Sequence, residues 1–306
     1  MITKPFLKWA GGKGKIIPEI IKVLPKKFED RKITYVEPFL GGGAVFFGLS
    51  QHYNNFERVI ISDINSDLIN SYVMVRDNLP QLIKILEDLQ KEYHSILDLE
   101  KKAEYYYSKR NLYNSRNTNN INQAALFIFL NRTCFNGLYR VNKKNEFNVP
   151  IGSYTKPEIC NKDNLLNVSK ALAKVEIFST DYENTYKMLE NEKAFFYIDP
   201  PYKPISKTSQ FNAYSNVNFD DHEQIRLKKF CDKLNERNHL WILSNSDMSE
   251  HEKHHSFFDD LYSNYQIDCV NAKRYINSDA KKRGDLKELL IINNLEKNFN
   301  HKDEKN

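Results

Sequence analysis

Short apolar segments alternate with helical ones along most of the chain, and this alternation restricts the fold more than any other feature. The strand-like segments are residues 33–37, 58–61, 175–179, 194–198 and 239–243. Helical periodicity separates several of them, most clearly over residues 222–234. Strands that alternate with helices predict an α/β fold with a mostly parallel sheet. The last two apolar segments, 267–272 and 288–293, flank a polar turn and predict an antiparallel hairpin at the sheet edge.

Between about residues 66 and 160 the pattern changes to that of an insertion. Long amphipathic helices are expected here, with residues 79–99 as one of them, before an Asn-rich loop at 116–120 and a basic, turn-rich segment. The simplest division is one discontinuous α/β domain that carries a mainly helical insertion. The expected parts are residues 1–65 and 161–296 for the α/β domain, 66–160 for the insertion, and 297–306 for a polar tail that we expect to be disordered.

Positive charge is concentrated in two segments, although the net charge of the chain is only +5. Residues 1–32 hold nine Lys and Arg against three acids, and residues 273–287 hold six against two. Such clustering suits a polyanionic partner. A lysine-rich, solvated surface explains it equally well, so charge alone decides nothing.

Cysteine spacing and the N-terminus place the chain inside the cell. The four cysteines, Cys134, Cys160, Cys231 and Cys269, lie far apart and form no CxxC pair, which predicts reduced thiols and neither a zinc site nor a disulfide framework. The N-terminus lacks the apolar run of a signal peptide, and no apolar stretch is long enough to span a bilayer. We therefore expect a cytoplasmic protein with no membrane contact and no metal.

Three predicted strands end in residues suited to ligand binding. In an open α/β sheet, ligands bind beyond the carboxyl ends of the strands. Glu37 leads into a turn in which Gly41 and Gly43 allow a ligand to approach the backbone closely. Asp63 follows Gly43 by twenty residues, a spacing at which a carboxylate accepts hydrogen bonds from ribose hydroxyls. Alone these two signals are weak, because Phe46 breaks the GxGxxG pattern.

The third strand end is more specific, because residues 194–198 run into Asp199-Pro200-Pro201-Tyr202. Two prolines stiffen the turn and remove its backbone donors, which leaves carbonyl groups as fixed acceptors. Asp199 and the Pro200 carbonyl can accept the two N–H bonds of a planar heterocyclic amine, while Tyr202 stacks on its ring. Accepting both protons makes the amine nitrogen a better nucleophile.

Several blocks of the sequence together resemble one family. They are FLKWAGGKGK at 6–15, VEPFLGGGAVFF at 36–47, ISDIN at 61–65, NRTCFNGLYRVNKKNEFNVPIGSY at 131–154 and YIDPPYKPISKTSQFNAY at 197–214. In this order they are similar to the Dam-type (D12 class) DNA adenine-N6 methyltransferases, which include modification enzymes of GATC-specific restriction systems. The resemblance implies a Rossmann-like methyltransferase sheet with an inserted target-recognition domain. It further implies S-adenosylmethionine as methyl donor and double-stranded DNA as substrate, with GATC as the expected site and a restriction endonuclease as a possible functional partner.

The same resemblance assigns roles around the cofactor. Trp9 and Lys13 would contact S-adenosylmethionine, and the turn from Glu37 through Gly41 to Gly43 would hold its methionine part. Asp63 would bind the ribose hydroxyls, and Asp181, after the strand at 175–179, would lie near the cofactor adenine. Asp199 to Tyr202 would receive the target base, which must leave the base stack before it can react. Methyl transfer would then be a direct displacement.

The insertion would read the DNA sequence. The matching residues are Lys8, Phe135, Asn136, Leu138, Arg140 and Pro150. Arg140 suits a bidentate contact to guanine, the commonest specific contact in the major groove. Phe135 would wedge into the base stack, at a position where the family often has Tyr, and Pro150 would contact a thymine methyl group. Lys8 is the candidate for the first guanine.

Other functions account for less of the sequence. Residues 251–255 (HEKHH) match the zinc-protease pattern, but their surroundings are polar, so we expect a solvated helix start. A nicotinamide-dependent oxidoreductase would share the glycine turn but gives no reason for residues 199–202. Methyltransferases that act on RNA or protein glutamine more often carry Asn before the two prolines. A non-enzymatic DNA-binding module would not need a cofactor site.

Overall fold

A seven-stranded sheet forms the centre of the molecule. The structure is a computed structural model that describes residues 2–201, 219–246, 255–273 and 285–300. The strands are β1 (Ile33–Glu37), β2 (Phe56–Asp63), β3 (Glu176–Ser179), β4 (Ala194–Ile198), β5 (Leu240–Ser246), β6 (Gln266–Lys273) and β7 (Asp285–Ile292). Their order is β3-β2-β1-β4-β5-β7-β6, parallel from β3 to β5, with β7 antiparallel to both β5 and β6. The predicted parallel sheet with an antiparallel edge hairpin is confirmed.

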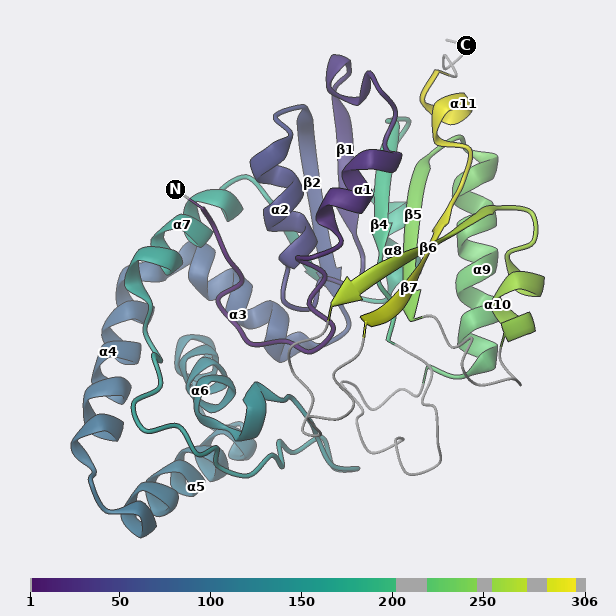
Figure 1. The fold of residues 1–306 in the computed structure, drawn as a ribbon. Helices are drawn as coiled ribbons and strands as arrows, with labels where there is room; N and C mark the ends of the chain where they lie inside the picture. The colour runs from purple at the N-terminus through teal and green to yellow at the C-terminus, as the bar shows by residue number, and fades with distance from the viewer. Residues whose placement is uncertain (1, 202–218, 247–254, 274–284, 301–306) are drawn as a thin grey trace.

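Helices cover both faces of this sheet (Figure 1). Those of the first half are α1 (Ile17–Val23), η1 (Phe28–Asp30), α2 (Ala44–His52), α3 (Ser66–Asp77), α4 (Leu79–Ser95), α5 (Leu99–Ser115), α6 (Asn120–Thr133) and η2 (Phe135–Gly137). Those of the second half are α7 (Lys162–Leu172), α8 (Tyr182–Lys187), α9 (Asp221–Glu236), α10 (His255–Leu261) and α11 (Leu295–Asn300). No helix in the described part of the chain is both long and apolar enough to cross a membrane.

The central strands are buried on both faces, which explains why they read as unbroken apolar runs. Successive side chains of a strand point to opposite faces. Tyr35 and Phe195 therefore join the core formed with α1, α2 and the helices from α3 to α7. Their neighbours Val36 and Phe196 join the second core, under α8, α9 and α10. Burial on both faces is typical of parallel strands in α/β proteins.

The helices α4, α5 and α6 lie together below the sheet in the view of Figure 1. The central one is α6, whose residues 123–131 are all buried. A helix that is apolar on all sides must be enclosed by others, and α6 packs against α3, α4 and α5. The apolar stretch at 124–130 is therefore the centre of the helical part.

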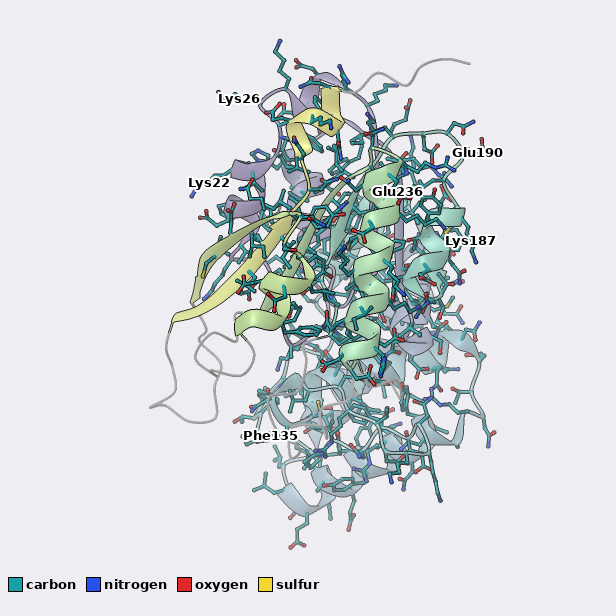
Figure 2. All side chains as sticks on the ribbon, turned by 90° about the vertical axis from the view of Figure 1, so that its right-hand side faces the viewer. Lys22, Lys26, Phe135, Lys187, Glu190 and Glu236 are labelled. Atoms are coloured by element: carbon teal, nitrogen blue, oxygen red, sulfur yellow. The ribbon has the colours of Figure 1, made fainter. Side chains whose placement is uncertain are left out.

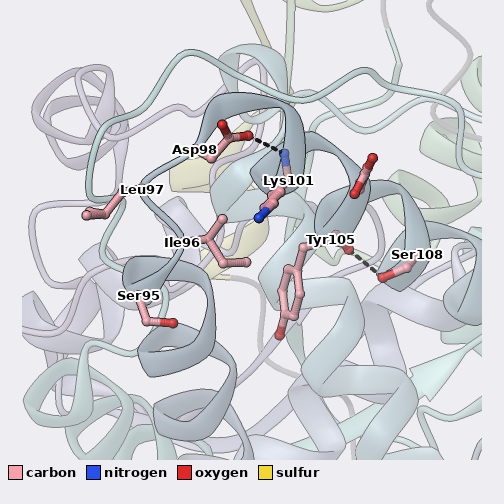
Figure 3. Close-up of a pocket in the computed structure, with 8 residues that line it drawn as sticks. Ser95, Ile96, Leu97, Asp98, Lys101, Tyr105 and Ser108 are labelled. Atoms are coloured by element: carbon pink, nitrogen blue, oxygen red, sulfur yellow. Dashed lines mark hydrogen bonds between the residues drawn. The ribbon is translucent and has the colours of Figure 1, made fainter.

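The helix expected over residues 79–99 is wrong in its extent, because two helices occupy this region. The first, α4, ends at Ser95, and Asp98 begins α5 by accepting a hydrogen bond from the backbone N–H of Lys101, 2.9 Å away. An Asp at this position caps a helix start, which explains the break. Figure 3 shows the resulting corner, a hollow of about 700 Å³ that contains none of the predicted site residues.

The expectation of a disordered tail over residues 297–306 is wrong for its first four residues. They belong to α11, in which Asn298 and Phe299 are buried. The ring of Phe299 packs on that of Phe28, with 6.0 Å between ring centroids, and Arg31 lies over its face. Asn298 adds hydrogen bonds to Asn235 and to the carbonyl of His239, so polar residues take part in this docking and composition did not reveal it. Residues 301–306 lie outside the described residues.

Candidate functional site

The turn after β1 is built around glycines that leave room for two aromatic side chains. Gly41 and Gly43 have φ angles of 49° and 70°, in the left-handed region that favours glycine. A Cβ atom on Gly41 would lie 2.9 Å from Cδ1 of Trp9, and one on Gly43 would lie 2.8 Å from the hydroxyl of Tyr72. Trp9 therefore packs directly on this turn.

Glu37, the last residue of β1, is a buried carboxyl group. The hydroxyl of Tyr35 donates a 2.6 Å hydrogen bond to its Oε2 atom. Burial raises the pKa of Glu37 to about 8, and the negative charges of Asp199 and Asp63 add to this shift, while the Tyr35 hydrogen bond opposes it. Without a ligand, Glu37 is therefore largely protonated at neutral pH.

Asp63 ends β2 and ties the glycine turn to the next helix. Its Oδ2 accepts the backbone N–H of Gly41 at 3.0 Å, and its Oδ1 accepts that of Asn65 at 2.9 Å. Asn65 in turn caps α3 through two backbone N–H groups. Burial raises the pKa of Asp63, and the backbone hydrogen bonds oppose the shift. The two predicted cofactor-binding strand ends thus meet at one place.

Asp199 follows β4 at the centre of this edge, surrounded by polar groups from other strands. Ser244 on β5 donates a 3.1 Å hydrogen bond to its Oδ1, and the ammonium of Lys13 lies 3.4 Å from the same oxygen. Burial raises the pKa of Asp199 to about 6, with the Lys13 charge opposing this and the Glu288 charge adding to it. Pro200 is buried beside it. Tyr202 lies outside the described residues.

Lys13 is engaged by acidic side chains in this structure. It is 3% exposed, and its ammonium lies 2.9 Å from Oε2 of Glu288 on β7 as well as near Asp199. Sequence reasoning missed Glu288, which is separated from Lys13 by 275 residues. Lys13 was predicted to contact the cofactor. In this structure its ammonium lies beside Asp199 and Glu288.

Asp181 caps α8 and pairs with an arginine. Its Oδ1 accepts the backbone N–H of Glu183 at 3.0 Å, and the guanidinium of Arg226 on α9 bonds both of its oxygens, at 2.7 and 3.1 Å. Its neighbour Tyr182 packs on Phe39 of the glycine turn, with 5.1 Å between ring centroids. The end of β3 therefore adjoins that turn through aromatic rings.

Four of the six predicted DNA-reading residues lie on a turn that follows α6, and Lys8 and Pro150 lie outside it. It forms η2, in which Asn136 and Gly137 both have left-handed φ angles, 53° and 64°. The backbone N–H of Phe135 donates to the carbonyl of Pro150 at 2.9 Å, which joins two of the predicted readers. Phe135 is 46% exposed, and Figure 2 shows it on the helical part, at the opposite end of the molecule from Lys26. We call residues 135–140 the recognition turn.

Arg140 is held by its guanidinium at the end of the recognition turn. Its Nε donates a 2.7 Å hydrogen bond to Oδ1 of Asn148. The side chain of Leu138, two residues earlier, is partly buried against the main core. Holding one edge of a guanidinium reduces the conformational freedom that would be lost on binding a base.

Lys8 lies beside the recognition turn although more than 120 residues separate them. Buried Asn131 accepts the backbone N–H of Lys8 at 2.8 Å and donates to the carbonyls of Lys8 and Gly137 at 2.7 and 3.2 Å. A Cβ on Gly137 would lie 2.4 Å from Cδ of Lys8. The Lys8 ammonium lies 3.7 Å from the centre of the Tyr154 ring. Sequence reasoning missed Asn131, whose only signal was its place in the NRTCFNGLYR block.

The structure also bears on the competing zinc motif. Residues 251–254 of HEKHH lie outside the described residues, and α10 begins at His255. Among the residues that the structure describes, no three His, Cys, Asp or Glu side chains are arranged to hold a metal ion.

The fold and the acidic sheet edge together define a class of protein, the Rossmann-like, S-adenosylmethionine-dependent methyltransferases. The site fits this cofactor chemically. Glycines give access to the backbone, and Asp63 can accept hydrogen bonds from hydroxyls. The carboxylates of Asp199 and Glu288 flank the single ammonium of Lys13, and this excess of negative charge favours a ligand that carries positive charge.

Comparison with known proteins identifies the family. A sequence model of the D12 class N6 adenine-specific DNA methyltransferases matches residues 9–276. The type II methyltransferase M.MjaIII of Methanocaldococcus jannaschii is 48% identical over 298 residues, which cover 96% of this chain and 100% of that protein. DNA adenine methylases of Haemophilus influenzae and Escherichia coli K12 are 34% and 31% identical, over 94% and 95% of this chain and 93% and 95% of their own. The chain therefore belongs to the D12 class and is an adenine-specific DNA methyltransferase.

Proposed function

We propose that the enzyme methylates adenine within the double-stranded sequence GATC, after the base has rotated out of the duplex. The observation that carries this proposal is the arrangement of the recognition turn, where Asn131 holds Lys8 and Gly137 together. In this division of labour, residues 1–65 and 161–296 bind the cofactor and perform the chemistry. Residues 66–160 recognise DNA, with Phe135 as the wedge, and residues 297–306 form a C-terminal extension.

At the chemical centre, Asp199 and the Pro200 carbonyl accept the two hydrogens of the adenine amine. With a pKa of about 6, Asp199 is ionised at pH 7 and above, so its carboxylate is an acceptor only. Ser244 contacts Oδ1 and so fixes the orientation of the carboxylate. Held in this way, the amine presents its lone pair to the methyl group, and positioning supplies much of the rate. Tyr202 stacks on the base.

The cofactor residues work by holding the donor in line with the amine. S-adenosylmethionine supplies a methyl group activated by its positively charged sulfur. Asp63 binds the ribose hydroxyls, Trp9 and the turn at Gly41 and Gly43 enclose the methionine part, and Glu37 adds acidic surroundings for the positive charge. Asp181 is already paired with Arg226. It therefore helps to form the wall of the pocket near the cofactor adenine and does not act as an unpaired carboxylate.

We propose the remaining DNA contacts from the resemblance of residues 6–15 and 131–154 to sequence blocks of the family. Arg140 reads one guanine and Lys8 the other, Asn136 and Leu138 contact the neighbouring bases, and Pro150 contacts a thymine methyl group. One relative is a type II methyltransferase and others are DNA adenine methylases. Both a pairing with a restriction endonuclease and a solitary role are therefore compatible with the chemistry. Because the substrate is DNA, we place the enzyme in the cytoplasm.

The proposal is tested by expression in a host without adenine methylation, followed by mapping of modified bases. We expect N6-methyladenine at GATC sites, and none in cells that express the Asp199→Ala variant at the same level. Adenine methylation at another sequence would overturn the GATC assignment. A near-normal rate of the purified Asp199→Ala variant, with cofactor and DNA saturating, would overturn the role of Asp199 as amine acceptor.

A further inference from the structure

A buried chain of three charged side chains joins β7 to the chemical centre. Glu288, Lys13 and Asp199 come from β7, from the segment before α1, and from the end of β4. Their side chains are 11%, 2% and 21% exposed. The ammonium of Lys13 lies 2.9 Å from Oε2 of Glu288 and 3.4 Å from Oδ1 of Asp199. The ammonium of Lys13 thus lies closer to Glu288 than to Asp199, although both carboxylates are within ion-pair range.

This asymmetry matters because Asp199 must remain a good acceptor. An ammonium in direct contact with the carboxylate would compete with the adenine amine for its lone pairs and would lower its basicity. An absent ammonium would leave two buried carboxylates without compensation, which favours protonation of one of them. The contacts of Lys13 and Ser244 with Asp199 are both to Oδ1, at 3.4 and 3.1 Å.

We propose that Glu288 is a positioning residue that draws the Lys13 ammonium away from Asp199 and so keeps the Asp199 carboxylate available to the substrate amine. The proposal rests on the proposed role of Asp199. Glu288 itself touches neither substrate nor donor in this scheme and acts only through Lys13.

The other groups that face Asp199 in the described part of the chain do not duplicate this effect. Ser244 on β5 donates one hydrogen bond to Asp199 and is itself paired with the hydroxyl of Tyr197 on β4, 2.8 Å away. Glu37 on β1 is largely protonated at neutral pH and therefore carries little charge that could act on Asp199. The charge balance at Asp199 is therefore set mainly by Lys13 and Glu288.

The proposal predicts opposite shifts for two substitutions. In Glu288→Gln, the ammonium turns to Asp199 and lowers its pKa, so the acid limb of the pH–rate profile moves to lower pH by roughly one pH unit. In Lys13→Met, the negative charge of Glu288 acts unopposed, the pKa of Asp199 rises, and the acid limb moves to higher pH. The Glu288→Gln rate at pH 8 should fall about tenfold, because Asp199 is then tightly paired, and Glu288→Asp should restore part of it.

The experiment measures single-turnover methylation of a GATC duplex between pH 5 and 9, with enzyme and cofactor in excess. Glu57→Gln is the matched control, since Glu57 is an exposed acid that pairs with Lys32 away from the site. In parallel, the pKa of Asp199 is followed without cofactor or DNA by ¹³C NMR of carboxyl-labelled enzyme, with the signal assigned by Asp199→Asn. This second measurement does not depend on catalysis.

The outcomes distinguish a failure of the positioning role of Glu288 from a failure of the proposed role of Asp199. Opposite shifts in both the rate profile and the NMR titration support the positioning role. Slower but unshifted Glu288→Gln and Lys13→Met enzymes would overturn it and leave Glu288 as a structural residue. Opposite shifts in the NMR titration with an unshifted rate profile would instead overturn the role of Asp199 as amine acceptor.

Discussion

Single residues at the sheet edge carry charges that depend on their surroundings, and Glu37 is the clearest case. Its folded-state pKa of about 8 lies above the ordinary value of 4.5. Between these two values the folded protein retains a proton that the unfolded chain has released. Without a ligand, the contribution of Glu37 to stability is therefore complete below about pH 4.5 and is lost as the pH rises through about 8.

Replacing this residue should reverse its pH dependence. We expect Glu37→Gln to gain stability relative to the parent as the pH rises from 5.5 to 8, by about 1 kcal/mol per pH unit. Denaturant unfolding of both proteins at several pH values measures this difference. A difference that does not change with pH would show that Glu37 is ionised in the folded protein. The same variant should bind the cofactor more weakly, because the carboxyl group is lost.

Substitution of Arg140 can distinguish a contact with a base from a contact with a phosphate group. If it donates two hydrogen bonds to guanine, Arg140→Ala should lose roughly 1–3 kcal/mol of discrimination at that base pair. Activity would then fall much more on GATC than on a duplex in which that guanine is replaced. A phosphate contact would instead weaken all sequences equally and reduce the salt dependence. Methylation of cognate and substituted duplexes at two salt concentrations separates these cases, and unchanged discrimination at every position would refute base reading.

At the scale of elements, the N-terminal segment and the end of α6 act as one unit because Asn131 joins them. Asn131→Leu keeps the volume but leaves three backbone groups without their partner, which should cost about 1–3 kcal/mol of stability. It should also reduce discrimination at the positions read by Lys8 and by Arg140 together, since both depend on the same geometry. Discrimination is measured on singly substituted duplexes.

Gln123 provides the matched control on the same helix. It is 8% exposed and bonds the carbonyl of Tyr113 and the hydroxyl of Thr118, away from Lys8. Gln123→Leu should lower stability to a similar degree and leave sequence preference unchanged. Equal losses of discrimination in both variants would mean that general destabilisation, rather than the link through Asn131, is responsible.

At the scale of the whole molecule, the C-terminal helix α11 is docked on the sheet domain through Phe299. Phe299 is 3% exposed and packs on Phe28. Phe299→Ala should therefore cost about 3 kcal/mol, as expected for the loss of a buried ring. Phe135→Ala, the same change at an exposed ring, should alter stability little and impair DNA methylation. Urea unfolding of both variants makes the comparison, and equal losses would contradict the docking of α11.

Prediction from the sequence succeeded where the signal was local. The apolar runs at 194–198 and 239–243 gave β4 and β5, and the polar turn before residue 288 gave the antiparallel edge. It failed where a single side chain decides the outcome, as at Asp98, which starts a new helix, and at Phe299, which docks an otherwise polar tail. These effects depend on specific tertiary or capping contacts, which periodicity does not reveal.

The residues of the candidate site likewise include some that the sequence predicted and some that it did not. Asp63 and Asp199 stand next to strand ends, so their convergence followed from the parallel sheet alone. Glu288 and Asn131 do not, because their partners lie 275 and 123 residues away in the chain. These residues meet their partners only when the chain is folded, and no pattern in a single sequence predicts contacts over such a separation.

The short segment from Lys8 to Lys13 has a geometric consequence. Lys8 lies at the recognition turn, while Lys13 lies at Asp199. Five steps of extended backbone reach at most roughly 18 Å, and successive bases of a DNA strand are about 3.4 Å apart. If Lys8 contacts a base, the length of this segment limits the distance between that base and the methylated adenine to about five base pairs. This limit favours a short, continuous recognition sequence over two half-sites separated by a long spacer.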